Sequence, residues 1–362
     1  MLYYLLKPYW HKFILFNLFR YITFRMVMGA TTGFVVSWLV TKWLIKYLKR
    51  HHYESQIRED VPERHLSKKG TPTMGGIAIV IGILAGTLIW ARLGSPYVIL
   101  AIFTLILTAI VGFIDDYLKD IRKKPKGLLA KYKLYGQFAV GLVVSLMIYI
   151  YPPLTDLRSA TELPFIKNFY LEMGVGYILF STLVVVGTSN AVNLSDGLDG
   201  LAAGLVGILA ATFTVVAYVS GRVDFTGYLN ITFLPGSGEL SIFCASMSGA
   251  ILGFLWYNTY PAEIFMGDTG ALSLGASIGA ISIMLKKEFL LLIAGGMFVI
   301  ETLSVIIQVL YFKYTGGKRI FKMSPLHHHY ELSGMHEAKI VVRFWILGII
   351  FALLGLASFK VR

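Results

Sequence analysis

Long apolar segments alternate with short polar ones along nearly the whole chain. A membrane-spanning helix needs about 20 mainly apolar residues. Candidate spans by that criterion lie at 24–47, 75–94, 97–115, 134–152, 174–193, 199–219, 240–258, 271–285, 289–312 and 341–359. No stretch has the pattern of a separate soluble domain. The pattern predicts an all-α, polytopic integral membrane protein of about ten transmembrane helices, forming a single domain over residues 1–362.

The first 22 residues mix aromatic, basic and aliphatic side chains. Aromatic and basic residues together are typical of helices that lie in the membrane interface. We expect residues 1–22 to form such an interfacial segment, the alternative being a simple leader to the first span. No small-residue cleavage site follows a short apolar core, so a cleaved signal peptide is not expected.

The composition agrees with a membrane protein. Of 362 residues, 56% are hydrophobic and 15% charged, whereas soluble proteins have about 25% charged residues. The net charge is +13, but the basic residues lie in short loops between apolar segments. That distribution favours cytoplasmic loops and phosphate or anionic lipid ligands, and no nucleic-acid partner is expected. The single cysteine, Cys244, excludes a disulfide within one chain.

With ten spans, alternate connections share one face: 48–74, 116–133, 194–198, 259–270 and 313–340. Most basic loop residues lie on this face. The opposite connections hold only Arg92, Arg158, Lys167, Arg222, Lys286 and Lys287. The positive-inside rule therefore predicts that the first face is cytoplasmic and that both termini lie outside. The polar motifs described next all fall on this face, which indicates one active site.

A central polar motif runs from Asn190 to Gly200 between two apolar segments. Its asparagines and aspartates recur every three residues and so share a helix face: Asn190, Asn193, Asp196 and Asp199. Carboxylates in such a sequence are costly and are candidates for function. The alternative is a polar turn with an aspartate as helix cap, which explains only one of them.

Two further motifs place carboxylates at helix ends. Asp115 and Asp116 close the third predicted span, although that end of a helix prefers cations. A metal ion or Lys119 would relieve their repulsion. Asp268 lies between Gly267 and Gly270, just before the next apolar segment, and is either a helix cap or a metal ligand. Lys131 and Lys133, just before the next span, belong either to this site or only to the positive-inside pattern.

Other residues near the predicted cytoplasmic face have two possible roles each. The segment SKKGTPTMGG, with Lys68 and Thr73, suits phosphate binding or a basic membrane anchor. Phe265 suits stacking on an aromatic base or anchoring at the interface. Three consecutive histidines, 327–329, suit phosphate contacts better than zinc, the alternative being ordinary loop residues. For Glu301 and Gln308 a structural hydrogen bond and a ligand role remain equally open.

The carboxylate, lysine and histidine side chains together indicate a class of reaction. Carboxylate oxygens suit a hard cation, so Mg²⁺ is the metal we expect. Lysines and histidines around acidic metal ligands are the usual components of phosphoryl transfer. Their place at the membrane surface implies one water-soluble phosphate substrate and one lipid-borne substrate.

The motifs resemble those of the phospho-N-acetylmuramoyl-pentapeptide transferases, within the polyprenyl-phosphate N-acetylhexosamine-1-phosphate transferase superfamily. The resemblance covers almost the whole chain, through SKKGTPTMGG, GFIDDYLKD, NAVNLSDGLDGLA, NTYPAEIFMGD, PLHHHYE and FWILGIIFALLGLASFKVR. Ser195 stands where the family more often has threonine, and it keeps the hydroxyl.

The resemblance implies an enzyme of the bacterial inner membrane with its site facing the cytoplasm. It would join undecaprenyl phosphate to the phospho-sugar of UDP-MurNAc-pentapeptide, with Mg²⁺, giving lipid I and UMP. Asp268 would be the main metal ligand, with Asp115 and Asp116 as further candidates, and Asp115 would activate the lipid phosphate. Asn193, Asp196 and Phe265 would hold the uridine end. Catalytic roles are expected for Asp115, Asp116, Asp268 and His327, and substrate contacts for Lys68, Thr73, Lys119, Lys131, Asn190, Asn193, Asp196, Asp199, Phe265, Gln308, His328 and His329.

Several alternatives remain open from sequence. A sibling transferase would use UDP-GlcNAc, although the HHHYE motif favours the muramoyl-pentapeptide branch. A secondary transporter would use the carboxylates for coupling ions, but transporter sites lie near the midplane between repeats. Direct attack and an aspartyl-phosphate intermediate are both compatible with the motifs, and we favour direct attack. A homodimer is also compatible with the sequence.

Overall fold

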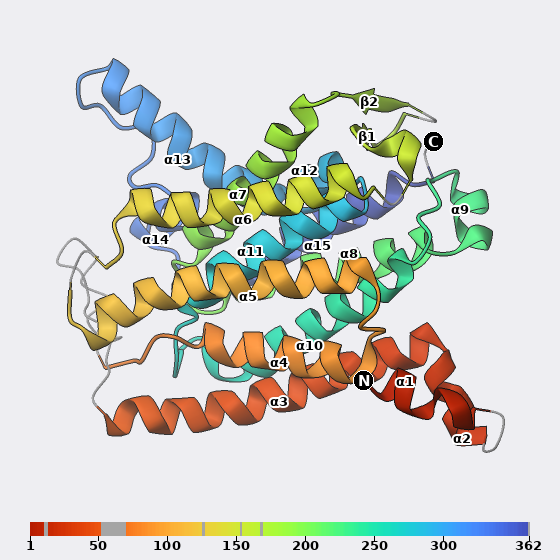
Figure 1. The fold of residues 1–362 in the computed structure, drawn as a ribbon. Coiled ribbons are helices and arrows are strands. Elements are labelled where there is room, and N and C mark those ends of the chain that lie inside the picture. The colour runs from red at the N-terminus through yellow and green to blue at the C-terminus, as the bar shows by residue number, and fades with distance from the viewer. Residues whose placement is uncertain (11–13, 52–69, 125–126, 153, 167–168, 361–362) are drawn as a thin grey trace.

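A computed structural model describes the chain except residues 11–13, 52–69, 125–126, 153, 167–168 and 361–362. The chain forms a bundle of long, roughly aligned helices (Figure 1). The helices are α1 (Leu2–Leu6), α2 (Ile14–Asn17), α3 (Ile22–Arg50), α4 (Gly76–Trp90), α5 (Pro96–Asp116), α6 (Ala130–Ile150), α7 (Gly176–Ser195), α8 (Leu201–Ser220), α9 (Val223–Leu229), α10 (Leu240–Asn258), α11 (Gly267–Met284), α12 (Glu288–Ala294), α13 (Gly296–Tyr314), α14 (Leu326–Leu332) and α15 (Glu337–Ala357). Short 3-10 turns occur at Lys7–Tyr9, Leu18–Arg20, Thr155–Leu157 and Ser237–Glu239, and a π-helical turn at Tyr117–Ile121 extends α5.

In the part of the chain that is described, eight helices are long and apolar enough to cross a membrane: α3, α5, α6, α7, α8, α10, α13 and α15. The prediction of a mainly helical, polytopic membrane protein is therefore confirmed. The predicted spans at 75–94 and 271–285 correspond to α4 and α11. Helix α4 has only 15 residues, about 22 Å at 1.5 Å per residue, so the number of ten spans stays a prediction.

Helix α11 is the centre of the bundle. All its residues from Thr269 to Met284 are buried, and it packs against α4, α5, α6, α7 and α8. Small residues let neighbouring backbones approach closely. Gly275, for example, has the backbone of Thr188 and Ser189 within 2.6–2.7 Å of where a Cβ would be. The N-terminus of α11 is thereby held against the ends of several other helices.

The single predicted span at 289–312 is wrong in detail, because the helix breaks at Gly295 into α12 and α13. Gly295 has φ −90° and ψ 20°, outside the helical region. A Cβ at Gly295 would lie 2.7 Å from the carbonyl oxygen of Leu291, so the break leaves little space for a side chain. Helix α12 packs on α15, whereas α13 packs on α7 and its far end projects away from the bundle (Figure 1). The break therefore redirects the chain toward the histidine motif.

The N-terminal residues form short helices packed on the end of α4. The Met1 ammonium donates to the carbonyl oxygen of Leu88 at 2.6 Å, and Phe19 stacks on Trp90 with ring centroids 5.4 Å apart. The expected single helix over 1–22 is thus several short pieces. Whether they lie in the membrane interface stays a prediction.

A two-stranded antiparallel hairpin, β1 (Ala160–Glu162) and β2 (Tyr170–Glu172), was not predicted. It covers the α11–α12 connection, since Lys287 forms a buried ion pair with Glu162 and the Thr161 hydroxyl donates to Glu288. The two chain ends also lie toward the hairpin end of the bundle (Figure 1). The ends of α5 and α14 and the start of α11 lie at the opposite end, which holds the acidic residues. Both termini thus share one end, while the side of the membrane they face stays a prediction.

Candidate metal and phosphate site

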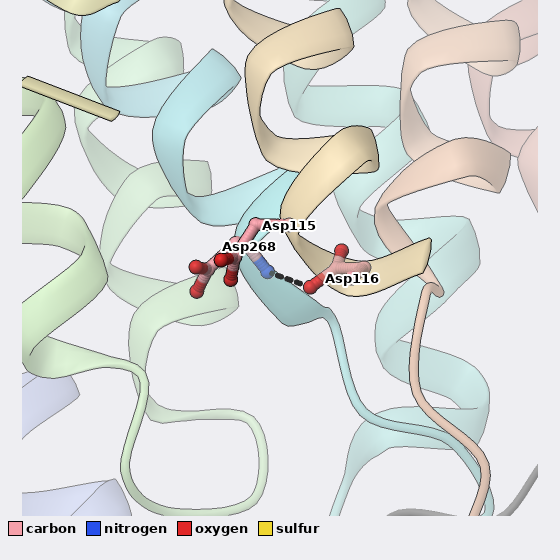
Figure 2. A group of neighbouring side chains, drawn as sticks. All are labelled: Asp115, Asp116 and Asp268. Atoms are coloured by element: carbon pink, nitrogen blue, oxygen red, sulfur yellow. Dashed lines mark hydrogen bonds between the residues drawn. The ribbon is translucent and has the colours of Figure 1, made fainter. Parts of the chain in front are cut away.

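Three aspartates meet where α5 ends and α11 begins. Carboxylate oxygens of Asp115, Asp116 and Asp268 lie within 4.8 Å of one another (Figure 2). Asp115 and Asp116 are buried and Asp268 is partly exposed. Residues from two distant motifs are therefore brought into one cluster, as expected from the sequence.

Two glycines make this approach possible. A Cβ added to Gly112 on α5 would be 2.3 Å from the carbonyl oxygen of Asp268. One added to Gly76, at the start of α4, would be 2.1 Å from the backbone nitrogen of Gly270. Such contacts are too short for any side chain, so the two positions require glycine. The start of α11 is held by backbone contact with both α4 and α5.

Asp116 has a structural role that its neighbour Asp115 lacks. Its carboxylate accepts hydrogen bonds from the backbone N–H groups of Asp268 (2.9 Å) and Thr269 (2.8 Å) and from the Thr269 hydroxyl. These are unsatisfied donors at the N-terminus of α11, where a negative charge is also favoured by the helix dipole. Asp116 therefore caps α11 from another helix, which leaves Asp115 and Asp268 as the better placed ligands for a cation.

Two lysines bridge the remaining carboxylates. Lys133 Nζ lies 3.0 Å from Asp115 Oδ2 and also pairs with Asp268. Lys119 pairs with Asp115 and lies 3.3 Å from Asp268 Oδ2. Asn193, from the central motif, donates its side-chain amide to Asp268 Oδ1 at 2.8 Å. The repulsion expected between the acidic groups is thus relieved by ammonium groups from two elements.

The other predicted phosphate ligands lie elsewhere. Lys131 is exposed, and its ammonium lies over the Tyr132 ring, 5.1 Å from the centroid. Thr73 donates its hydroxyl to Asp120, one turn after the acidic pair. Lys68 lies outside the described residues. The structure therefore brings Lys133, and not Lys131, to the acidic cluster.

The central motif divides into residues with different partners. Asn190 donates to Gln137 Oε1 on α6 at 2.8 Å. Asp199 is buried and accepts from the backbone N–H of Ala262 at 3.0 Å, which ties it to the loop before α11. Burial, together with the negative charges of nearby aspartates, raises the pKa of Asp196 to about 8. Asn193 and Asp196 therefore belong to the acidic site, while Asp199 organises the loop.

The three histidines lie on the short helix α14, so their side chains point in different directions. His327 is buried, and its Nδ1 lies 3.1 Å from Glu301 Oε2, while its backbone N–H donates to Glu301 Oε1. His328 Nδ1 lies 3.0 Å from Glu331, and His329 Nδ1 accepts the backbone N–H of Lys322 at 3.1 Å. Each ring thus has its own partner.

His327 is the histidine that faces the central motif. Its Nε2 is buried without a hydrogen-bond partner in the described structure, and a Cβ on Gly197 would lie 2.3 Å from it. A carboxylate only accepts hydrogen bonds, so Glu301 requires the proton on Nδ1. Burial lowers the pKa of His327, although Glu301 opposes the shift. A neutral ring then presents a free acceptor at Nε2 beside Gly197.

Two other predicted substrate contacts, Gln308 and Phe265, form hydrogen bonds that involve the backbone. Gln308 accepts from the backbone N–H groups of Ile320 and Phe321 and donates to the Phe321 carbonyl, at 3.0–3.2 Å. The backbone of Phe265 pairs with Pro72 and Gly75, each at 2.9 Å, and its ring is half-buried. The Gln308 side chain therefore anchors the loop before α14. The strand-like pairing at Phe265 joins the SKKGTPTMGG motif to the loop before α11.

Sequence reasoning left Lys133 open as a site residue but selected Lys131 alone, and it missed Gln137 as the partner of Asn190. Both lie on α6, where nothing in the local pattern separates Lys133 from Lys131. Helical spacing is the one available signal. Lys133 and Gln137 are four residues apart and so share a face.

The donor set fits Mg²⁺. The cluster offers carboxylate oxygens, which are the ligands that this hard cation prefers. Asp115 and Asp268 face one another across Lys119 and Lys133 and would hold the ion; Asp115 also accepts the backbone N–H of Leu128 at 2.7 Å. The oxygens of Asp116 are instead bound to the start of α11. The arrangement can bind a cation and phosphate groups side by side.

The class of protein follows first from a family model. Residues 98–286, more than half of the chain, match the model of glycosyl transferase family 4. Residues 68–80 match a shorter model described as phospho-N-acetylmuramoyl-pentapeptide-transferase signature 1.

Full-length relatives then define the family within this class. The chain is 47% identical over 362 residues to the phospho-N-acetylmuramoyl-pentapeptide-transferase of Desulforapulum autotrophicum, with both chains covered completely. It is 49% identical over 348 residues to that of Thermodesulfovibrio yellowstonii, with 96% of each chain covered. The corresponding protein of Rickettsia bellii is 47% identical over 363 residues, again with complete coverage of both chains. The chain belongs to the family of phospho-N-acetylmuramoyl-pentapeptide transferases.

Proposed function

We infer that the protein transfers phospho-MurNAc-pentapeptide from UDP-MurNAc-pentapeptide to undecaprenyl phosphate in peptidoglycan biosynthesis. The products are lipid I and UMP. The observation that carries this inference is the set of acidic and basic groups in which Asp115 and Asp268 share Lys119 and Lys133. Full-length relatives with the transferase name support the same reaction.

We favour direct attack by the lipid phosphate. A phosphate oxygen of the lipid forms a bond to the sugar-linked phosphorus of the nucleotide sugar, and the bond from that phosphorus to the UMP oxygen breaks. In phosphoryl transfer the protein acts mainly by positioning and by stabilising charge. Lys119 and Lys133 would bind the phosphate oxygens on which charge develops, and Asp115 would orient the lipid phosphate.

Mg²⁺, when bound at Asp268 and Asp115, would neutralise the diphosphate of the nucleotide sugar. Asn193 holds Asp268 in place through the hydrogen bond to Oδ1. Asp196, Asn193 and the half-buried ring of Phe265 would hold the uridine end. His327, with a free acceptor at Nε2, would accept a hydrogen bond from a hydroxyl of the substrate. His328 and His329 would bind at the edge of the same site.

We further propose that the protein lies in the bacterial inner membrane with this site facing the cytoplasm. The distribution of basic loop residues supports that orientation, and it places the site where a soluble nucleotide sugar can reach it. The lipid bilayer supplies the second substrate. A homodimer also remains a prediction.

The test is a comparison of donor substrates. Purified protein is incubated with Mg²⁺, undecaprenyl phosphate and either UDP-MurNAc-pentapeptide or UDP-GlcNAc, and UMP release is measured. We expect UMP only with the muramoyl donor, loss of release after EDTA, and no turnover by Asp268→Asn. Release of UMP from UDP-GlcNAc alone would assign the chain to the sibling branch. Flux of substrate across proteoliposomes without UMP formation would indicate a transporter.

A further inference from the structure

A large groove opens at the end of the bundle that is opposite the acidic cluster. It lies between α5 and α6, with the loops before α5, after α6 and before α10 around its mouth. Its volume is about 1060 Å³, near the upper end of the roughly 300–1,000 Å³ that is typical of ligand pockets. No residue of the proposed active site lines it.

The walls of the groove are mainly apolar. Leu100 and Phe103 line it from α5, Val143 and Met147 from α6, and Met284 from the end of α11. Val143 and Met147 are 41% and 47% exposed, so the groove is open along the side of α6 and not enclosed. From Val143 to Tyr151 the lining extends for about 12 Å along the helix at 1.5 Å per residue. An apolar chain that enters from the membrane would fit along this wall.

The mouth of the groove is cationic. Arg92 and Arg158, both exposed, line it from opposite loops. Within the described residues neither guanidinium forms an ion pair. Arg92 lies over the Tyr3 ring and hydrogen-bonds to the Tyr4 side chain, and Arg158 lies over the Tyr149 ring. Glu239 also lines the mouth, but it is paired with the buried Arg25 at 2.6 Å. The groove therefore has at its entrance two exposed guanidinium groups that form no ion pair in the described structure.

Several other basic residues at this end are paired or buried, although Lys360 is exposed over the Tyr228 ring. Arg222 pairs with Asp224 at 2.8 Å, Lys287 with Glu162, and Lys286 is buried over the Tyr177 ring. Arg92 and Arg158, by contrast, are exposed and have no carboxylate partner in the described structure. A guanidinium is well suited to bind phosphate through two parallel hydrogen bonds.

We propose that the groove binds an anionic phospholipid, with its phosphate between Arg92 and Arg158 and one acyl chain between α5 and α6. The Tyr97 hydroxyl also lines the groove and is buried without a hydrogen-bond partner in the described part of the chain. It can donate to an ester carbonyl of the lipid, which is an acceptor that an apolar detergent tail lacks. The lipid belongs to the leaflet opposite the acidic cluster, so this site is separate from that of the polyprenyl substrate.

The test measures lipid binding to the delipidated full-length protein by native mass spectrometry. Dioleoylphosphatidylglycerol is compared with dioleoylglycerol, which has the same chains and no phosphate. We expect the wild-type protein to bind phosphatidylglycerol at least about tenfold more tightly, as for charge-assisted hydrogen bonds. The double variant Arg92→Gln/Arg158→Gln should lose this preference, while Arg222→Gln, an exposed arginine at the same end, should keep it.

A second pair of variants tests the position of the acyl chain. Val143→Trp fills the groove and should weaken binding of phosphatidylglycerol, whereas Leu142→Trp should not, because Leu142 is similarly exposed (39%) but lies outside the lining. Unchanged binding by Val143→Trp or by the double arginine variant would overturn the proposal. Equal binding of dioleoylglycerol would also overturn it. Preferential displacement by undecaprenyl phosphate, or a change from dimer to monomer in the arginine variant, would assign the groove to the substrate or to a second copy instead.

Discussion

Lys131 and Lys133 lie two positions apart on α6, yet their side chains have different surroundings. Lys133 reaches Asp115 and Asp268, while Lys131 is exposed over the Tyr132 ring. Residues two apart on a helix do not share a face. A local sequence pattern that contains both lysines therefore cannot say which one belongs to the site, and the orientation of α6 decides.

Substitution of these lysines by methionine should separate them. We expect Lys133→Met to lower kcat by about 100-fold or more, because a fixed positive charge is lost where charge develops. Lys131→Met, the matched control, should stay within a few-fold of wild type. UMP release under saturating substrates is the measurement. A large loss in Lys131→Met with a small one in Lys133→Met would return the phosphate role to Lys131.

Glu301 positions His327 and fixes the proton on Nδ1. In Glu301→Gln the amide can donate to Nδ1, so the proton moves to Nε2 and the acceptor toward Gly197 is lost. We expect kcat to fall at least about tenfold and the pH–rate profile to change. The double variant Glu301→Gln/His327→Gln should be no slower than His327→Gln alone, since Glu301 acts through that ring. Additive losses would show that Glu301 has a separate role.

The raised pKa of Asp196, about 8, has a consequence for stability. An unfolded aspartate has a pKa near 3.8, so between about pH 4 and pH 8 the folded chain binds more protons than the unfolded chain. The free energy of unfolding must then fall as pH rises through this window. In metal-free buffer we expect the wild-type melting temperature to decrease from pH 6 to pH 8, and Asp196→Asn to decrease less. Parallel profiles for the two proteins would contradict this expectation.

At the scale of secondary-structure elements, the hairpin is held to the α11–α12 connection by buried polar groups. Lys287 and Glu162 have side chains only 2% and 3% exposed. Tyr177 and Thr161 both donate hydroxyl hydrogen bonds to the buried Glu288. Strands of three residues have little stability by themselves. These contacts therefore determine that the hairpin forms here.

Replacing one member of this ion pair should lower the free energy of unfolding more than replacing both members. Lys287→Met or Glu162→Leu leaves a buried charge without its counter-charge, which costs about 3–5 kcal/mol. The double variant Lys287→Met/Glu162→Leu should be less destabilised than the sum of the single effects. Denaturant titration in detergent measures the free energy of unfolding of each protein. Additive single effects would mean that the pair contributes no coupling.

The helices were largely predictable, and the exceptions have physical causes. Apolar length locates a span, so each predicted span has a helix at its position. The break at Gly295 was missed because hydropathy does not register a change of direction. The short helix α14 was expected to be a loop, since it has only seven residues and its face is set by Glu301 and the loop that Gln308 anchors.

At the scale of the whole molecule, the two ends of the bundle differ in function. The acidic site and α14 lie at one end, while the hairpin, both chain ends and the apolar groove lie at the other (Figure 1). The basic loops predict that the acidic end is cytoplasmic.

Cysteine labelling tests this orientation. Cys244 is buried and is the only cysteine, so it can be replaced by alanine first. Asp156→Cys, exposed at the hairpin end, should react with a membrane-impermeant thiol reagent in intact cells. Lys318→Cys, exposed near α14, should react only after permeabilisation. The reverse pattern would invert the topology and place the acidic site outside.

The sequence by itself determined the spans, the polar motifs and the types of chemical group, because hydropathy and side-chain chemistry are local properties. Only the tertiary structure decided which of these groups meet. Asp116 caps a helix that begins about 150 positions later, Lys133 reaches the aspartates that Lys131 does not, and His327 faces Gly197. Such pairings depend on the rotation and close approach of whole helices, which are set by small residues such as Gly112 and by the packing around α11.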